Sequence, residues 1–282
     1  WTQDRIREIR HVYYAMAAEA DAFVGEFLQA LDSSPFAQNT YVFFWSDHGE
    51  IRYFALQIST FSLQGASRVS LIVRGPGVRE NVVVERPTSL LDVFPTVCDI
   101  SSTPYPTGEY ALAGYSLEPD LADEETEEGR ALLDKFQGSE PHPPYIITQW
   151  HGDHTNTGQF SVREGEWKLI HYAYFNESHG EFTLLFNLTA DPNEANDLSS
   201  QYPEVVSSMM DILEKELGNM TAIDLEAKTW DREIFSAWRA SLGNESNYEK
   251  VMGEESLRWY SAWITNPSLW LQLIDEWQHQ ES

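Results

Sequence analysis

Cysteine and basic residues are scarce in this sequence, and apolar runs of membrane length are absent. A single cysteine, Cys98, excludes an internal disulfide, and its apolar, helix-spaced neighbours predict a buried thiol that serves packing. Only 18 Lys and Arg residues stand against 45 Asp and Glu residues, so the formal net charge is −27. This charge argues against a nucleic-acid partner and an anionic membrane surface. An anionic small substrate stays open, because a metal ion or a few local cations can override the global field.

The sequence also lacks an initiator methionine, a signal peptide and any run near the ~18 apolar residues that a membrane span needs. We therefore expect no membrane span, and we expect the chain to be the later part of a longer protein. Its 282 residues are 42% hydrophobic and 13% aromatic, which is enough for one large or two medium folded domains.

Glycosylation sequons are concentrated in the second half of the chain. Each has the pattern N-x-S/T without proline in the middle, and the acceptors are Asn176, Asn187, Asn219 and Asn244. Together with the lack of cysteine pairs, they favour a secretory or lysosomal route.

The first part of the chain has an α/β pattern. Apolar residues recur at three-to-four spacing over residues 4–31, which predicts a long amphipathic helix. The stretch "YVFFWSDHGE" (41–50) then predicts a strand buried on both faces, ending in a loop at the sheet edge where ligands bind. Further strands are predicted at 69–74, closed by a "GPG" turn, and at 81–85. A helix is predicted over 88–100, with Pro95 either in its first turn or at a kink.

The second part has short strand-like runs separated by turn residues. These runs are "PYIITQW", "QFSVREG", "WKLIHYAY" and "FTLLFNL", and they predict a small antiparallel sheet followed by an amphipathic helix that ends at Gly218. A Pro-, Gly- and Ser-rich stretch and an acidic run suggest a domain boundary near Glu118. The predicted fold is α/β: residues 1–117 end a large α/β domain, and 118–282 form a smaller domain with an antiparallel sheet and a helical tail.

The ordered blocks of the first part resemble the sulfatase family of the alkaline phosphatase superfamily. The blocks are "YYAMAAEADAFVGEFLQAL", "NTYVFFWSDHGE", "VSLIVRGPGV" and "PTSLLDVFPTVCDI". The resemblance continues through "GYSLEP", "HPPYIITQWHG", "EWKLIHY" and "LFNLTADPNEANDLSS", and so covers nearly the whole chain. The tail resembles most a branch of the family that acts on glucuronate 2-sulfates in glycosaminoglycans. The resemblance implies a mixed-sheet sulfatase domain and a sulfated carbohydrate substrate.

The resemblance also implies a metal site at the end of the first strand. Sulfatases attack sulfur with a hydrated formylglycine beside a calcium ion, which an Asp followed by Asn or His helps to bind. Asp47 and His48 match that pair. Asp suits Ca²⁺, whereas His is an unusual ligand for it and leaves room for another divalent ion. From the residues alone, "DHG" after a strand is as readily a turn as a site.

The chain departs from the family pattern in ways that bear on catalysis. It contains no C/S-x-P-x-R motif, so the nucleophile and the other metal carboxylates are expected on an N-terminal segment of the same protein that precedes this chain. The position of the sulfate-contacting lysine is taken by Ser59, and Gln64 and Ser70 replace a family glutamate and proline. Arg52 or Arg68 could substitute for the lysine, and Arg52 is preferred because it lies only four residues beyond His48.

One further motif, "HGDH" at 151–154, contains three potential metal ligands. A structural role or one at the substrate rim fits it better than a metal cluster, and the family match of "WHG" places His151 at that rim. Three interpretations stay open: a calcium-dependent sulfatase whose nucleophile lies upstream, an inactive sulfatase-like glycan-binding or assembly component, and a phosphodiesterase relative of the same superfamily. The residue at the upstream nucleophile position separates them.

Overall fold

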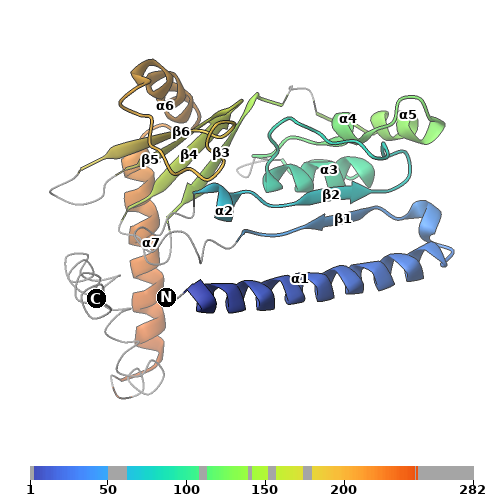
Figure 1. The fold of residues 1–282 in the computed structure, drawn as a ribbon, viewed down its shortest axis with the longest axis horizontal. Coiled ribbons are helices and arrows are strands. Elements are labelled where there is room, and N and C mark those ends of the chain that lie inside the picture. The colour runs from blue at the N-terminus through green and yellow to red at the C-terminus, as the bar shows by residue number, and fades with distance from the viewer. Residues whose placement is uncertain are drawn as a thin grey trace. The chain divides into compact units, whose positions relative to one another are not determined.

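The structure, a computed structural model, describes residues 3–49, 62–107, 113–138, 142–151, 157–173, 180–244 and 246. The chain divides into two compact units (Figure 1). The first comprises residues 1–56 and 68–143, and the second comprises 57–67 and 144–282. The division after residue 143 differs from the predicted boundary near Glu118, because the short helices α4 (Glu118–Leu121) and α5 (Glu127–Leu133) belong to the first unit.

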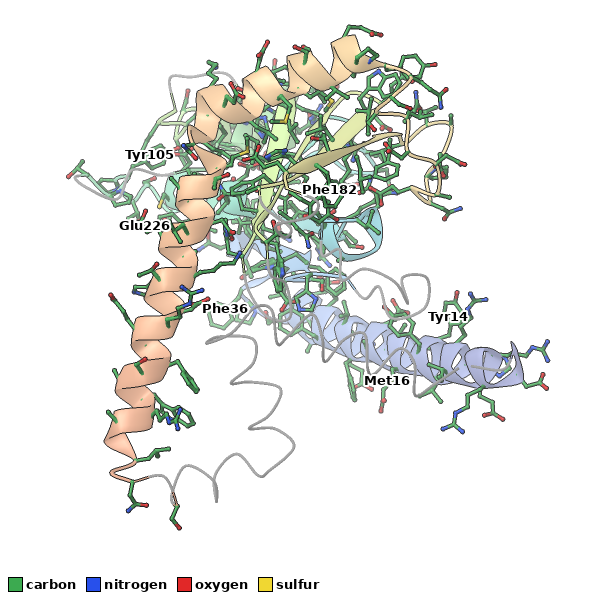
Figure 2. The ribbon with its side chains drawn as sticks, turned by 90° about the vertical axis from the view of Figure 1, so that its left-hand side faces the viewer. Tyr14, Met16, Phe36, Tyr105, Phe182 and Glu226 are labelled. Atoms are coloured by element: carbon green, nitrogen blue, oxygen red, sulfur yellow. The ribbon has the colours of Figure 1, made fainter. Side chains whose placement is uncertain are left out.

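The first unit begins with α1 (Gln3–Asp32), which confirms the helix predicted over residues 4–31. Its apolar side chains are exposed: Tyr14 and Met16 retain 67% and 63% of their accessible surface and project from the helix (Figure 2). The Arg74 guanidinium binds the Asp32 carboxylate at the end of the helix. The apolar stripe of α1 is therefore left uncovered by the described residues.

The strand predicted at 41–45 is present as β1 (Val42–Trp45), but its predicted burial is wrong. It pairs antiparallel with β2 (Leu71–Arg74), with Val42 opposite Arg74 and Trp45 opposite Leu71. Phe44 and Trp45 remain 44% and 47% exposed, because β1 has no other strand partner among the described residues. We refer to this pair of strands as the β1–β2 ribbon.

The strand predicted at 81–85 is absent from the structure. Asn81 has a φ of 55°, a left-handed conformation that a strand does not accommodate, and the valines that follow are exposed without sheet pairing. No neighbouring strand pairs with these valines within the described part of the unit. The prediction of a strand from β-branched residues alone was therefore wrong.

The helix predicted over 88–100 forms in two pieces, η2 (Leu90–Asp92) and α3 (Val93–Ile100). Pro95 lies in the first turn of α3, where its missing N–H costs no intrahelical hydrogen bond, and Cys98 is buried as predicted. The buried Asp92 carboxylate accepts hydrogen bonds from the backbone N–H groups of Ser89 and Tyr115 and lies 3.0 Å from His142 Nε2. These contacts tie the start of the helix to two later loops.

The second unit contains the predicted antiparallel sheet. Its order is β3-β4-β5-β6, with β3 (Tyr145–Trp150), β4 (Gln159–Glu164), β5 (Trp167–Tyr172) and β6 (Phe182–Asn187). A two-residue turn joins β4 to β5, and Gly165 adopts a φ of 55° there, as such tight turns require. Each strand extends the sheet by one antiparallel pairing along the sequence.

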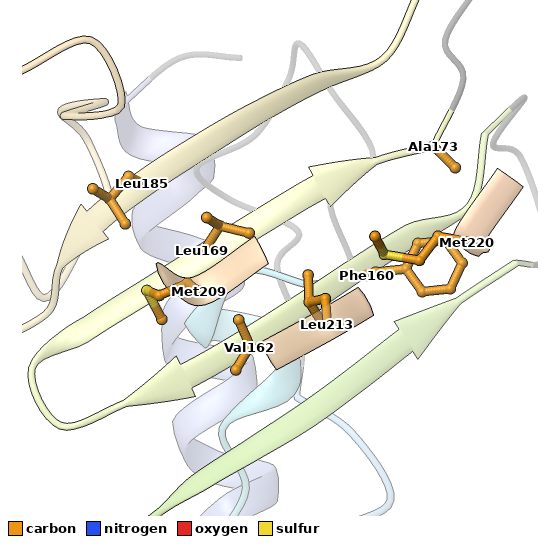
Figure 3. Packing of buried hydrophobic residues seen from close by; sticks show 8 residues of the cluster. All are labelled: Phe160, Val162, Leu169, Ala173, Leu185, Met209, Leu213 and Met220. Carbon is orange, nitrogen blue, oxygen red and sulfur yellow. The ribbon is translucent and has the colours of Figure 1, made fainter. Parts of the chain in front are cut away.

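Helix α6 (Pro203–Leu217) covers one face of this sheet and builds the main core (Figure 3). It ends at Gly218, as predicted, where φ is 78°. Helix α7 (Met220–Ser241) follows directly and is capped by the Asn219 side chain, which accepts the Ala222 N–H. None of the described helices combines the length and apolarity needed to cross a membrane. The core residues are Phe160, Val162, Leu169, Ala173, Leu185, Met209, Leu213 and Met220.

The opposite face of the sheet carries Ile170, Tyr172 and Phe186, and Leu63 packs against them. Leu63 precedes the four-residue helix α2 (Gln64–Ser67), which belongs to the second unit although β2 of the first unit follows it closely in sequence. A short segment from the early part of the sequence, which contains Leu63 and α2, is thus part of the core of the C-terminal unit.

Candidate functional site

The predicted metal ligands Asp47 and His48 follow β1 after Ser46, where the chain bends at Asp47. Asp47 Oδ1 accepts the His48 backbone N–H at 2.8 Å, and Ser46 Oγ donates to the His48 carbonyl at 2.7 Å. The His48 ring lies with Nδ1 3.0 Å from the Gly49 carbonyl and Nε2 3.7 Å from Asp47 Oδ2. This bond from the His48 N–H orients the Asp47 carboxylate.

The electrostatics of the turn keep Asp47 ionised. The hydrogen bond from the His48 backbone N–H, supported by the nearby His48 ring, lowers the pKa of Asp47 below its usual value. The side chain is 83% exposed, so its oxygens are accessible to a ligand. Among the described residues no group of three or more His, Cys, Asp or Glu side chains is arranged to hold a metal ion. Asp47 and His48 can therefore supply only part of a coordination shell.

Arg68 lies near the same end of the β1–β2 ribbon. Because Trp45 pairs with Leu71, the residues that follow β1 and those that precede β2 emerge together, Asp47 and His48 on one strand and Arg68 on the other. Arg68 is exposed, and its guanidinium makes no ion pair within the described part of the chain. The topology thus places two candidate metal ligands and a cation at one end of the ribbon.

Two of the positions that depart from the family pattern, Gln64 and Ser70, lie among the described residues. Gln64 begins α2, and Ser70 lies exposed directly before β2. Arg52 and Ser59 lie outside the described residues, as do residues 152–156 of the "HGDH" motif after His151.

His151 follows β3 and lies among polar groups of the second unit. Its Nδ1 is 3.4 Å from Asp224 Oδ1 on α7, and its Nε2 is 3.2 Å from Gln149 Oε1. The ring packs edge-on against buried Phe160, with ring centroids 5.0 Å apart. Burial disfavours the ionised Asp224, but hydrogen bonds from His151 and Lys228 outweigh it and lower the pKa of Asp224. His151 is therefore held in place from two sides and stays partly accessible.

Sequence reasoning missed a buried ion pair next to α2. Lys168 Nζ lies 2.9 Å from Glu194 Oε1, and the two side chains are only 3% and 2% exposed. A signal was available: in "WKLIHY" the lysine shares its strand face with Ile170 and Tyr172, which predicts an inward-facing cation that needs a partner. Nothing in the sequence identified Glu194 as that partner.

Comparison with known proteins relates these features to a family. Residues 1–102 match the model of the sulfatase family. Arylsulfatase K of Bos taurus is 33% identical over 283 residues, an alignment that covers 100% of this chain and 49% of that protein. Residues 1–102 thus form a sulfatase family domain. The chain spans about half the length of the curated sulfatases that it matches.

Solved structures agree with this sulfatase fold. A 2-O GAG (glycosaminoglycan) sulfatase has a TM-score of 0.61 and 24% identity, with coverage of 77% of this chain and 44% of that one. A phosphonate monoester hydrolase of Agrobacterium radiobacter has a TM-score of 0.56 and 24% identity, with coverage of 79% and 43%. At this identity the likeness concerns the α/β fold alone and does not separate sulfate from phosphonate chemistry.

The sequons differ in how exposed their asparagines are. Asn187 is partly buried, its Nδ2 donates to Glu166 Oε2 at 3.0 Å, and its Oδ1 accepts the backbone N–H groups of Thr189 and Ala190. Asn219 and Asn244 are exposed, although Asn219 Oδ1 caps α7 by accepting the Ala222 N–H, and Asn176 lies outside the described residues. We expect secretion from eukaryotic cells to yield high glycan occupancy at Asn219 and Asn244 and low occupancy at Asn187. Peptide mapping with and without glycosidase tests this, and Glu166→Gln is the matched variant. Equal occupancy at all three sites would contradict it.

Proposed function

We propose that this chain forms the C-terminal part of a divalent-metal-dependent sulfatase that hydrolyses sulfate esters of sugars in glycosaminoglycans. The observation that carries the proposal is the end of the β1–β2 ribbon, where Asp47, His48 and Arg68 emerge together. A sulfate ester carries negative charge that must be neutralised for attack at sulfur, and a metal ligand set next to a cation is suited to this task.

The residues at the end of the β1–β2 ribbon are suited to supply some of the ligands of a calcium site. The Asp47 carboxylate is ionised, exposed and a hard oxygen ligand, as Ca²⁺ prefers, while His48 is the weaker match. When bound, the ion would draw negative charge from the sulfate oxygens. The remaining ligands and the formylglycine nucleophile are assigned to an N-terminal segment of the same protein that lies outside this chain.

The other roles belong to residues of this chain. Arg68 binds a sulfate oxygen and takes the place of the lysine that Ser59 replaces, with Arg52 as the alternative cation. His151 contacts the sugar at the rim of the site. The resemblance of the tail to the branch that acts on glucuronate 2-sulfates favours a 2-sulfated uronate as the substrate unit. The sequons favour a secreted or lysosomal enzyme.

The test compares this chain with the full-length protein. The chain alone is expected to show no turnover of an aryl sulfate or of a 2-sulfated uronate disaccharide in excess Ca²⁺, because it lacks a nucleophile. The full-length protein is expected to turn over the disaccharide, to lose activity in chelator and to regain it when Ca²⁺ is restored. Turnover by the chain alone, or none by a full-length protein with intact formylglycine, would contradict the proposal.

A second candidate is a sulfatase-like glycan-binding or assembly component without catalysis. Ser59, Gln64 and Ser70 favour it, because they replace the sulfate-contacting lysine, a glutamate and a proline of the family pattern. The preceding sequence separates the candidates. A C-x-P-x-R motif supports the sulfatase, its absence supports the binding component, and a Thr or Ser nucleophile in another setting supports a phosphodiesterase relative.

A further inference from the structure

Helix α7 carries a row of large apolar side chains that are exposed. Trp230 and Ile234 lie one turn apart and retain 62% and 49% of their accessible surface. Trp238, one turn further along, is 36% exposed, and its ring centroid lies 5.7 Å from that of the buried Phe235. Residues four positions apart lie on the same face of a helix. We refer to Trp230, Ile234 and Trp238 as the α7 stripe.

The first turns of α7 attach the helix to the C-terminal unit. Met220 belongs to the main core, and the Asp224 carboxylate binds Lys228 and lies 3.4 Å from His151. The α7 stripe lies in the later part of the helix, which extends past the sheet (Figure 1). Large apolar side chains gathered on one exposed face mark an interaction surface, because their contact with water is unfavourable.

The end of α7 directs the chain out of the helical path. Gly243 has a φ of 80°, and its N–H donates to the Ala240 carbonyl at 3.1 Å. A left-handed glycine directly after the last turn is a common way to end a helix and change the direction of the backbone. Residues 247–282 follow this turn, and we refer to them as the C-terminal segment. They lie outside the described residues.

The sequence of the C-terminal segment contains an apolar row that matches the stripe. Its residues recur at the three-to-four spacing typical of a helix with one apolar face, and they are Trp270, Leu273, Ile274 and Trp277. At the helical rise of about 1.5 Å per residue, the α7 stripe spans about 12 Å and this row would span about 10 Å. Two apolar rows of similar length can cover each other.

We propose that the C-terminal segment docks on the α7 stripe of the same chain. Tethering favours this occupant over a second copy, because a short connection gives an effective concentration on the order of millimolar. The formal net charge of −27 also opposes the pairing of identical chains. Docking removes apolar surface from water on both partners, which is its driving force.

The first experimental arm identifies what covers the stripe. The photoreactive substitution Ile234→benzoylphenylalanine is made at the centre of the stripe in the full-length protein. After illumination, cross-links from this position are expected to reach the C-terminal segment. Mixing nitrogen-15-labelled with unlabelled protein separates links within a chain from links between chains. The matched control is Leu225→benzoylphenylalanine, at a leucine that is 61% exposed, and it is expected to give no link to the segment. At about 3.6 residues per turn, Leu225 faces the opposite side of α7 from Ile234.

The second arm asks whether the stripe holds the segment in place. The variant Trp230→Gln/Ile234→Gln/Trp238→Gln makes the stripe polar, and Leu225→Gln is its control. Brief digestion with chymotrypsin, which cleaves after aromatic residues, reports how accessible the C-terminal segment is. Cleavage there is expected to accelerate on the order of tenfold or more in the triple variant, because it follows the population of the undocked state. The control is expected to be cleaved like the wild type. Amides of β4 and β5 are expected to stay protected from hydrogen exchange in both variants.

Links from the stripe to the C-terminal segment of the same chain, together with faster cleavage in the triple variant, would support the proposal. Links only between chains would assign the stripe to a second copy and overturn it. Links only to other parts of the same chain, or none, would also overturn it. Unchanged cleavage of the segment in a triple variant whose sheet stays protected would show that the stripe does not hold the segment, and the proposal would fail.

Discussion

Replacing Asp47 by Asn in the full-length protein is expected to abolish high-affinity Ca²⁺ binding and to lower sulfatase activity by on the order of 100-fold or more, because a metal ligand is lost. The substitution keeps the shape of the side chain and its ability to accept the His48 N–H, and it removes only the charge. Calorimetric titration with Ca²⁺ gives affinity and stoichiometry, and turnover of the 2-sulfated disaccharide gives the effect on activity.

The matched control is Asp21→Asn, which removes another exposed carboxylate, from α1. This control is expected to bind Ca²⁺ and to turn over substrate like the wild type. If Asp47→Asn binds the ion with unchanged affinity and stoichiometry, Asp47 is no ligand. It would then serve only the turn, through its bond to the His48 N–H.

A second large effect is expected at Glu118, the first residue of α4. The side chain is fully buried, and both carboxylate oxygens lack a hydrogen-bond partner among the described residues. Burial, with the nearby Asp99 carboxylate as a further cause, raises the pKa of Glu118 to about 7. The folded protein therefore keeps Glu118 protonated at pH values where the unfolded chain has released that proton.

The sign of the pH dependence follows from this difference. The folded-state pKa lies above the unfolded value of 4.5, so the stabilising contribution is complete below pH 4.5 and is lost as pH rises to about 7. The shift corresponds to about 3 kcal/mol of unfolding free energy. Glu118→Gln is expected to remove this slope and to be more stable than the wild type at pH 8.

Urea unfolding of the full-length protein at intervals between pH 4 and pH 8 measures the slope. Glu204→Gln, at an exposed glutamate of α6, is the control and is expected to retain the wild-type profile. A Glu118→Gln profile that runs parallel to the wild type across this range would show that Glu118 ionises normally in the folded protein.

Much of the fold follows from local pattern. The three-to-four spacing of α1 and the closely spaced strands of the C-terminal sheet predicted their elements, because a helix face and a hairpin meander depend on residues close in sequence. The end of α6 was predicted from Gly218, whose left-handed conformation suits glycine. Asp47 and His48 were singled out as candidate ligands by their place after an apolar strand and by their likeness to a family motif, and their role stays a prediction.

The failures concern contacts between distant residues. The predicted burial of β1 was wrong because a strand is covered by other segments of the chain. The sequence of the strand does not specify which segments pack on it. The prediction of a strand at 81–85 was wrong because a strand requires a pairing partner as well as β-branched residues. Lys168 and Glu194 lie 26 positions apart, and neither residue indicates the other. Their pairing was for this reason invisible in the sequence.

The path of the chain between its two units has a consequence for how this protein could have been assembled in evolution. Residues 57–67 belong to the C-terminal unit, although they lie inside the sequence of the first unit. A gene segment encoding only residues 144–282 would encode Lys168 and Glu194 without α2, to which both side chains are hydrogen-bonded. The C-terminal unit is therefore no exchangeable module, and recombination between relatives is tolerated only where both stretches come from the same parent.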